Sequence, residues 1–291
     1  MADKQTVAVL GAGGTMGLPI ARNLAHSGHD VRAWNRTPEK SQPLSDHGAY
    51  IAEAPADAAA GADVLLTMLA DADAVIEATE AAVAEGTRDS DGVIWLQMST
   101  IGERGTARCI DLAAESALAF LDAPVLGTKK PAHEGELVIM ASGPRELEAR
   151  LGSIFDAIAA RTMWVGDAGA GTKLKIATAS WILAVVEGSA ETFALAESLS
   201  IDPRLVLDAV RGGPLDMAYL QMKGNAIIER DFEPSFKLAL AAKDAALVEE
   251  SAERHELALP LISAIRRRLE EGVPEHGDED FSATFLTSAR S

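Results

Sequence analysis

Short apolar segments alternate with helix-like segments along the first half of the chain. The apolar runs predict strands at Thr6–Leu10, Asp30–Trp34, Ala49–Ala52, Val64–Met68, Val93–Gln97, Ala119–Asp122 and Leu137–Ala141. Helical spacing predicts helices at Gly17–Ser27, from Pro38, and at Ala72–Ala84, Arg104–Glu115 and Pro144–Ile158. Strands that alternate with helices of about ten residues predict a parallel, doubly wound sheet.

The pattern changes after residue 166. The sequence GDAGAG (Gly166–Gly171) indicates a loop, and helical spacing then runs without proline from Thr172 to Ser200. At ~1.5 Å per residue this predicts a rod of roughly 43 Å, which is long for a helix that covers one sheet. The segments behind it are all helical in pattern, namely Pro203–Val210, Leu215–Glu229, Lys237–His255 and Leu259–Arg268. We therefore predict an α/β domain over 1–166 and an all-α domain over 167–291, linked by a long interdomain helix.

Composition and charge exclude several classes of protein. Of the 291 residues, 48 % are hydrophobic and only 4 % aromatic, so we expect a core of closely packed helices and small side chains. The 44 acidic and 26 basic residues give a net charge of −18, which repels nucleic acid and anionic lipid. The single cysteine, Cys109, excludes an intramolecular disulfide and has no clustered ligands that predict a metal site. Because the most apolar stretch, Trp181–Val186, is too short to cross a bilayer, we expect a cytoplasmic protein.

A cluster of glycines follows the first predicted strand and opens the first predicted helix. Glycine permits a tight turn there, and free N–H groups at a helix N-terminus hold a pyrophosphate. The spacing is GxGxxxG, one residue longer than the usual GxGxxG, so Gly13 and Gly14 are alternatives for the second glycine. The predicted cofactor contacts in this turn are Gly11, Gly13, Gly14, Thr15, Met16 and Gly17. With a strand before it and a helix after it, the turn predicts a Rossmann dinucleotide-binding domain.

The end of the second predicted strand discriminates between the two nicotinamide cofactors. NAD enzymes usually have Asp or Glu there to bind the ribose 2′-OH, whereas this chain has Asn35, Arg36 and Thr37. The Arg36 guanidinium can form a charge-assisted fork with a 2′-phosphate, and Asn35 and Thr37 add neutral donors. We therefore expect NADP(H) to be preferred over NAD(H).

Further motifs fall at strand ends or at the predicted domain junction, where ligands of such sheets bind. They are MLAD (Met68–Asp71), MSTIG (Met98–Gly102), the segment Asp122–Gly143 that begins DAPVLGTKK, and GAGTKLKIATAS (Gly169–Ser180). Near the C-terminus come FKLALAAKD (Phe236–Asp244) and GDEDFSA (Gly277–Ala283). Together with the glycine turn, these motifs resemble the β-hydroxyacid dehydrogenase family, which includes 3-hydroxyisobutyrate dehydrogenase and the N-terminal region of 6-phosphogluconate dehydrogenase.

The resemblance implies hydride transfer between NADP(H) and a small hydroxyacid, semialdehyde or related carbonyl compound. It identifies Lys175 as the lysine that exchanges a proton with the substrate oxygen, whereas Lys173 lies on another face of the helix. An ammonium beside a developing alkoxide stabilises its charge and can donate a proton. Partial burial and the positive helix N-terminus are expected to lower the pKa of Lys175 toward neutrality.

Other roles follow from position in the same motifs. The further cofactor contacts that the resemblance implies are Met68, Leu69, Ala70, Ser99, Thr100, Phe236 and Lys243. The implied substrate contacts are Ser99, Leu126, Gly127, Thr128, Thr178 and Ala179. Two of these depart from the family pattern, because Leu126 replaces a carboxylate-binding serine and Ala179 replaces an asparagine that contacts the substrate hydroxyl. Lys129 and Lys130 could supply charge instead, but we interpret them as a solvated pair in a loop.

Two rival functions stay open. The first is an NADPH-dependent imine reductase, a related two-domain enzyme. Lys175 argues against it, since such proteins generally have Asp or Tyr there, whereas Leu126 and Ala179 leave a pocket that is more apolar than a hydroxyacid substrate favours. The second is a catalytically silent NADP-binding protein. Under each function, the apolar helix from Thr172 to Ser200 predicts a homodimer or homotetramer.

Overall fold

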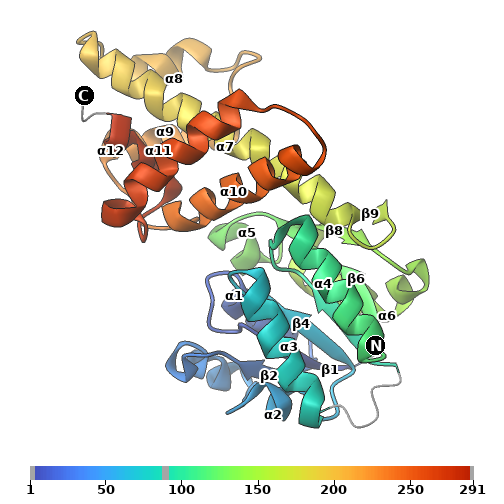
Figure 1. Cartoon of the computed structure of the whole chain (residues 1–291). Helices are drawn as coiled ribbons and strands as arrows, with labels where there is room; N and C mark the ends of the chain where they lie inside the picture. Colours follow the sequence, from blue (N-terminus) through green and yellow to red (C-terminus); the bar gives the residue numbers. More distant parts are fainter. Residues whose placement is uncertain (1–3, 87–91, 289–291) are drawn as a thin grey trace. The chain divides into compact units, whose positions relative to one another are not determined.

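Figure 1 shows the computed structural model of the chain, which describes residues 4–86 and 92–288. The chain divides after Lys175 into two compact units, an α/β unit and a helical unit. The division comes later than the predicted boundary at residue 166. The reason is that the first turn of helix α7 (Ala170–Ser198) is hydrogen-bonded to strand ends of the α/β unit.

The α/β unit is built on a sheet that confirms the predicted fold class. Its parallel part consists, in spatial order, of β3 (Tyr50–Ile51), β2 (Asp30–Trp34), β1 (Thr6–Leu10), β4 (Val64–Thr67), β5 (Ile94–Gln97) and β6 (Ala119–Asp122). This order is that of a Rossmann domain, in which the winding of the chain reverses between β1 and β4. Beyond β6, β8 (Leu137–Ser142) runs antiparallel to β6 and to β7 (Val125–Leu126), and β9 (Ala159–Gly166) runs parallel to β8.

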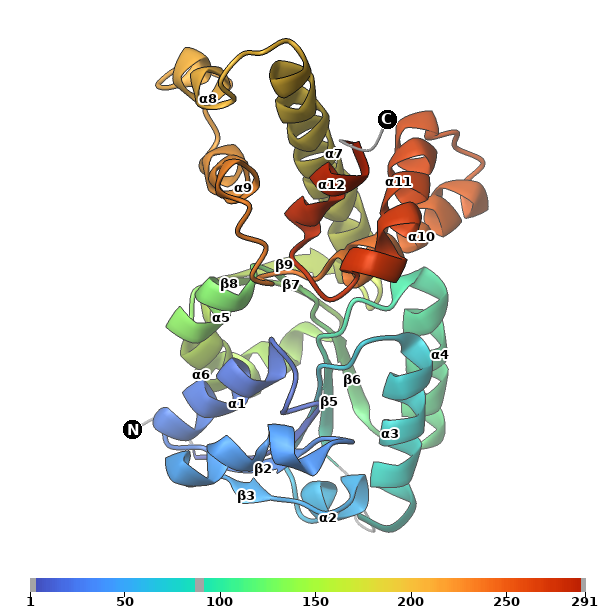
Figure 2. The same cartoon turned by 90° about the vertical axis from the view of Figure 1, so that its left-hand side faces the viewer.

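Helices cover both faces of this sheet (Figure 2). The side chains of β1 point alternately to the two faces, so that Val7 and Val9 lie in one buried cluster and Ala8 and Leu10 in the other. The helices on the Val7 face are α1 (Gly17–His26), α5 (Lys129–Glu134) and α6 (Glu148–Ile158). The helices on the opposite face are α2 (Pro55–Ala59), α3 (Ala72–Gly86) and α4 (Gly102–Glu115). Burial on both faces explains why the strands are continuous apolar runs.

The helical unit contains the remainder of α7 and several further helices, as predicted. These are α8 (Arg204–Val210), α9 (Ala218–Glu229), α10 (Leu238–Arg254), α11 (Pro260–His276), the 3-10 turn η4 (Phe281–Thr284) and α12 (Phe285–Ser288). One buried cluster joins α7, α10, α11 and η4, and a second joins α7, α8, α9 and α12. α11 continues past its predicted end at Arg268, with Pro274 inside the helix.

Three segments of the α/β unit differ from the sequence predictions. β9 is a strand that the pattern does not predict, because it pairs on one side only and much of it is exposed. Lys129 and Lys130 begin helix α5, although a loop is predicted there. The helix expected from Pro38 consists of two 3-10 turns, η1 (Pro38–Lys40) and η2 (Gln42–His47). Pro43 has no N–H to donate, which prevents a regular α-helix through this segment.

Helix α7 as a whole is long and apolar enough, by length and composition alone, to cross a membrane. The sequence argument that the most apolar stretch is too short to cross a bilayer concerns Trp181–Val186 alone, and it does not apply to the whole length of α7. Its apolar side chains are used in the helical unit, where Leu183, Val186 and Phe193 are buried. The carboxylate of Glu187 is buried among them and accepts a hydrogen bond from the hydroxyl of Thr284. Packing inside the helical unit therefore accounts for part of the apolar character of α7.

Candidate active site

The glycine turn connects β1 to α1 where the winding of the sheet reverses. Gly11 has a φ of +95°, and a Cβ there would lie 2.2 Å from a carbonyl oxygen at the end of β4. A Cβ at Gly17 would lie 2.1 Å from the carbonyl oxygen of Gly11, and one at Gly13 would lie 2.8 Å from the Asn35 side chain. At Gly14 the closest atom to a Cβ is 3.3 Å away. Glycine is therefore required at the first, third and seventh positions of the turn, which supports the enlarged GxGxxxG spacing.

The outer part of the turn presents hydrogen-bond donors. The N–H of Gly14 donates to the carbonyl oxygen of Gly11 at 3.0 Å, so it stabilises the turn itself. The N–H groups of Thr15 and Met16 have no acceptor among the described residues, and Thr15 is exposed. α1 begins directly behind them, at Gly17. Unpaired N–H groups at a helix N-terminus fit the charge of a dinucleotide pyrophosphate.

Asn35, Arg36 and Thr37 follow β2 beside the glycine turn. The Oδ1 of Asn35 accepts the N–H of Gly13 at 3.2 Å, and its Nδ2 donates to the carbonyl oxygen of Thr37 at 2.9 Å. The amide of Asn35 therefore shapes the turn. Arg36 is exposed, and its guanidinium has no hydrogen bond or ion pair with another residue of the described chain. This guanidinium can meet an anionic group of a bound nucleotide.

Ser99 lies where β4 and β5 end. It is 1 % exposed, its Oγ accepts the N–H of Leu69 at 2.8 Å, and its hydroxyl donates to the carbonyl oxygen of Thr67 at 3.3 Å. The side-chain amide of Gln97 bonds both the N–H and the carbonyl oxygen of Ser99. This buried serine fixes the path of the MLAD segment, and its expected contact with cofactor and substrate stays a prediction. The residues around it with exposed surface are Met68, Leu69, Ala70 and Thr100.

A buried carboxylate anchors the start of α7 to the end of β6. Asp122 has no exposed surface, and its two oxygens accept the N–H and the hydroxyl of Thr172, each at 2.8 Å. The hydroxyl of Ser142 donates to Asp122 at 3.1 Å and accepts the N–H of Gly171 at 2.8 Å. A Cβ at Gly171 would lie 2.1 Å from the carbonyl oxygen of Met140, so glycine is required for this close approach. Burial raises the pKa of Asp122 to about 6, because it outweighs the effect of these donors.

Lys175 lies one helical turn beyond this anchor. It follows Thr172 by three positions and therefore lies on the same side of α7. Lys175 is partly buried, whereas Lys173 is exposed. In the helical unit, Thr178 is also partly buried. Ala179 is 6 % exposed and packs in the core of that unit, and its expected substrate contact stays a prediction.

The segment Leu126–Thr128, which is expected to bind the substrate carboxylate, connects β7 to α5. Gly127 has a φ of +139°, and a Cβ there would lie 2.6 Å from the side chain of Leu137. Leu126, Gly127 and Thr128 are all partly exposed, so the segment is accessible to a ligand. The side chain of Thr128 carries the one hydroxyl group of this segment.

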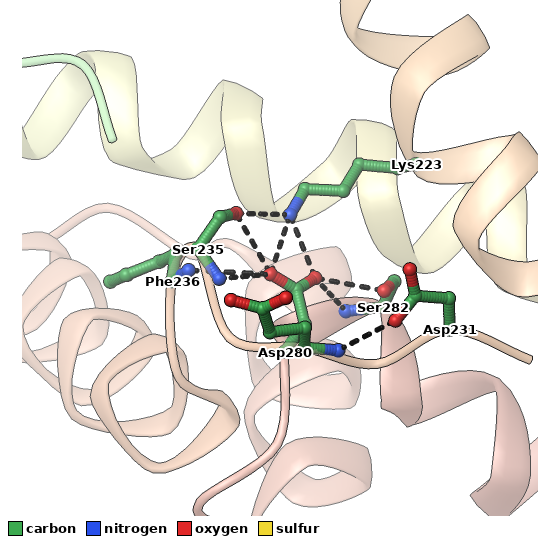
Figure 3. A network of polar contacts seen from close by, with 7 residues as sticks. Lys223, Asp231, Ser235, Phe236, Asp280 and Ser282 are labelled. Carbon is green, nitrogen blue, oxygen red and sulfur yellow. Dashed lines mark hydrogen bonds and ion pairs between the residues drawn. The ribbon is translucent and has the colours of Figure 1, made fainter. Parts of the chain in front are cut away.

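In the helical unit, a second buried aspartate fixes the segment that carries Phe236. Figure 3 shows Asp280 at the centre of this network. Its carboxylate accepts hydrogen bonds from Nζ of Lys223 at 2.7 and 2.9 Å, and from the N–H groups of Ser235 at 3.0 Å and Phe236 at 3.3 Å. Ser282 donates its N–H and its hydroxyl. Burial alone would raise the pKa of Asp280, but the charge of Lys223 and these hydrogen bonds lower it to about 2.

The two remaining predicted cofactor contacts also belong to the helical unit. The ring of Phe236 packs edge to face against Phe281, with centroids 6.0 Å apart. Nζ of Lys243 lies 3.1 Å from its neighbour Asp244. The sequence motifs predict no role for Asp122 or Asp280, although both residues lie within such motifs. The available signal for Asp122 was an acidic residue at the end of a buried strand.

Comparisons with known proteins match both units. A family model for the NAD binding domain of 6-phosphogluconate dehydrogenase matches residues 6–166, and one described as NAD-binding of NADP-dependent 3-hydroxyisobutyrate dehydrogenase matches residues 169–286. An uncharacterized oxidoreductase of Bacillus subtilis, YfjR, is 32 % identical and aligns over 95 % of this chain and 97 % of its own length. The chloroplastic glyoxylate/succinic semialdehyde reductase 2 of Arabidopsis thaliana is 29 % identical over 96 % of this chain and 78 % of its own.

A solved structure agrees with these matches. The 3-hydroxyisobutyrate dehydrogenase of Mycobacterium tuberculosis with L-serine is 27 % identical, with a TM-score of 0.87, and the superposition covers 99 % of this chain and 100 % of that one. The glycine turn, the order of the strands and the lysine motif at the start of α7 are thus accompanied by similarity along the whole sequence. The chain belongs to the β-hydroxyacid dehydrogenase family of NAD(P)-binding oxidoreductases.

Proposed function

We propose that this protein uses NADPH to reduce a small aldehyde or keto acid to the corresponding hydroxy acid, and that Lys175 is the proton donor. The observation that carries the proposal is the position of Lys175, which is partly buried and lies one turn beyond the anchored start of α7. The substrate class follows from the relatives, whose names include a glyoxylate/succinic semialdehyde reductase and a 3-hydroxyisobutyrate dehydrogenase.

The chemistry requires one hydride and one proton. Bound NADPH would supply the hydride to the carbonyl carbon. The Lys175 ammonium donates its proton to the carbonyl oxygen as the C=O double bond becomes a C–O single bond, and it is left as a neutral amine. Its positive charge also stabilises the developing alkoxide. In the oxidation direction, the neutral amine accepts the proton of the substrate hydroxyl.

The cofactor preference is argued from the end of β2. The exposed Arg36 guanidinium is unpaired among the described residues, and a 2′-phosphate would supply its missing partner. We expect Arg36→Gln to weaken NADPH binding about 10- to 100-fold and NADH binding far less, because a charge-assisted hydrogen bond contributes about 1.5–3 kcal/mol. Fluorescence titration of both cofactors measures this, with the exposed Arg211→Gln as the matched control. Equal losses for the two cofactors would contradict the 2′-phosphate role.

The decisive experiment compares two lysines of the same helix. NADPH oxidation is measured with glyoxylate, succinic semialdehyde and a panel of other carbonyls and imines. We expect Lys175→Met to lower kcat about 10²- to 10⁴-fold with little change in NADPH affinity. Lys173→Met, at an exposed position two residues away, is the control and should retain full activity.

The same panel separates the rival functions. Turnover of imines but not of carbonyls would favour an imine reductase. Binding of NADPH without any turnover would favour a catalytically silent NADP-binding protein. A Lys175→Met variant as active as Lys173→Met would overturn the proposed role of Lys175 under either enzymatic function.

We further propose that the protein acts in the cytoplasm as a homodimer or homotetramer, without nucleic-acid or membrane partners. The support for self-association is the exposure of large apolar side chains on α7 and directly after it, where Trp181, Leu195 and the following Leu199 are each about 60 % exposed. Light scattering over a range of concentrations tests this. A constant mass near 30.5 kDa would contradict it.

A further inference from the structure

We propose that Asp122 is a positioning residue of this enzyme, which fixes the first turn of α7 and thereby the place of the Lys175 ammonium. The inference rests on the proposed function, since it assumes that Lys175 donates the proton. It concerns a side chain that no motif assigns to cofactor or substrate, and that is buried too completely to touch either.

The first step is the geometry of the anchor. The two carboxylate oxygens of Asp122 bind the same residue of α7: one accepts the N–H of Thr172 and the other its hydroxyl, both at 2.8 Å. The N–H bond fixes the distance of the helix end from β6. The bond to the hydroxyl fixes the rotation of the helix about its axis. Thr106 of α4 lies 3.0 Å from the same hydroxyl, so that Thr172 is held from two elements of the α/β unit.

The second step joins this anchor to the lysine. Lys175 follows Thr172 by three positions, which is just under one helical turn and a rise of about 4.5 Å. Helical side chains lean toward the N-terminus, so Lys175 leans back toward the turn that Asp122 holds. A rotation of that turn therefore moves the Lys175 side chain sideways. A misplacement of about 1 Å at a reacting group can cost about 100-fold in rate.

The third step is the chemical choice of the anchor. Helix N-termini are ordinarily capped by a neighbouring Ser, Thr, Asp or Asn at the surface. Here the acceptor comes from a strand end fifty residues away in sequence and is an anion buried without a cation among the groups that bind it. Burial of an ionised carboxylate is costly, so a role in capping alone would be served as well by a neutral acceptor. A charged acceptor makes shorter and stronger hydrogen bonds, which hold the helix end in one place.

The experiment removes the anchor without touching the lysine. Thr172→Val keeps the shape of the side chain but removes the hydroxyl, and Thr172→Ser restores it. Thr79→Val is the matched control, because Thr79 is equally buried in the same unit and its hydroxyl has no partner among the described residues. Asp122→Asn is the stronger variant. For each protein, kcat and KM with succinic semialdehyde, NADPH affinity and the exchange rate of the Thr172 amide hydrogen are measured.

We expect Thr172→Val to lower kcat about 10-fold and Asp122→Asn about 10- to 100-fold, with NADPH affinity changed less than about 3-fold. Thr172→Ser should recover kcat to within about 3-fold of the wild type, and amide exchange at Thr172 should become faster only in the variants with low kcat. Full activity in Thr172→Val, or an equal loss in Thr79→Val, would overturn the inference. If Lys175→Met retains turnover, the proposed function fails first; if it abolishes turnover while Thr172→Val has no effect, only the role of Asp122 fails.

Discussion

Asp122 and Asp280 are both buried aspartates that fix a segment of the chain, yet their pKa values move in opposite directions. Asp122, in the α/β unit, is bound by neutral donors such as Thr172 and Ser142, and burial raises its pKa to about 6. Asp280, in the helical unit, accepts comparable neutral donors, but Nζ of Lys223 also lies 2.7 Å away, and its pKa falls to about 2. The positive charge of Lys223 is the largest of the effects that lower the pKa of Asp280, and no cation is among the described groups that bind Asp122.

This difference indicates two kinds of anchor. The pair of Asp280 and Lys223 is neutral as a unit, so it stabilises its surroundings as long as both partners are present. Asp122 has no such partner among its hydrogen-bonding groups, and its charge faces the positive N-terminal end of α7. We therefore expect substitutions around Asp280 to lower mainly the free energy of unfolding, and substitutions around Asp122 to lower kcat as well.

The largest effect should come from removing the cation of the paired site. Lys223→Met leaves Asp280 buried and charged without its counterion, which is expected to cost about 3–5 kcal/mol of unfolding free energy. Urea unfolding followed by circular dichroism measures this. The control is Arg211→Ala, which breaks the exposed pair of Arg211 and Asp208 and should cost less than about 1 kcal/mol. A loss at Lys223 as small as at Arg211 would show that Asp280 does not depend on its cation.

The next effect is a pH dependence of stability with opposite sign at the two sites. The folded-state pKa of Asp122 is about 6, above its ordinary 3.8, so its contribution to stability is complete below about pH 4 and falls by about 3 kcal/mol as the pH rises through 6. The folded-state pKa of Asp280 is about 2, so its contribution is complete above about pH 4 and falls by about 2 kcal/mol as the pH drops through 2.

Asparagine variants isolate these two contributions, because each removes one titration and leaves the others in place. The stability difference between wild type and Asp122→Asn should shrink as the pH rises from about 4 to 6. The difference between wild type and Asp280→Asn should grow as the pH rises from about 2 to 4. Urea titrations at each pH give both curves. Curves that run in the same direction would break the contrast between the two anchors.

Much of the fold could be predicted because its signals are local. The continuous apolar run at Thr6–Leu10 and the glycines behind it predict a buried strand and a turn from neighbouring residues alone. β9 and α5 could not be predicted in this way. β9 is stabilised by pairing with β8, and its own residues show no clear alternation, while α5 has only six residues and two lysines at its start.

The residues of the candidate site differ in the same way: some can be predicted from a short segment, and others depend on contacts between distant segments. The glycine turn and Arg36 follow from spacing and charge in one short segment. The anchor of Asp122 does not, since Ser142 meets it only through the pairing of β6 with β8, and Thr172 only when α7 approaches the end of β6. Ser99 shows a similar limit: its motif predicts a ligand contact, which stays a prediction, whereas its burial and its hydrogen bonds to neighbouring strand ends could not be predicted from the motif.

The smallest expected effect comes from removing one hydroxyl donor from each of the two buried aspartates. Ser142→Ala removes a donor to Asp122 and also leaves the buried N–H of Gly171 without its acceptor, which is expected to cost about 1–3 kcal/mol. Ser282→Ala removes one donor to Asp280, which keeps Lys223, and should cost about 0.5–1.5 kcal/mol. Unfolding in urea measures both losses, and the kcat of Ser142→Ala should fall as well, because the start of α7 is loosened. A greater loss at Ser282 than at Ser142 would mean that the cation gives Asp280 no protection against the loss of a neutral donor.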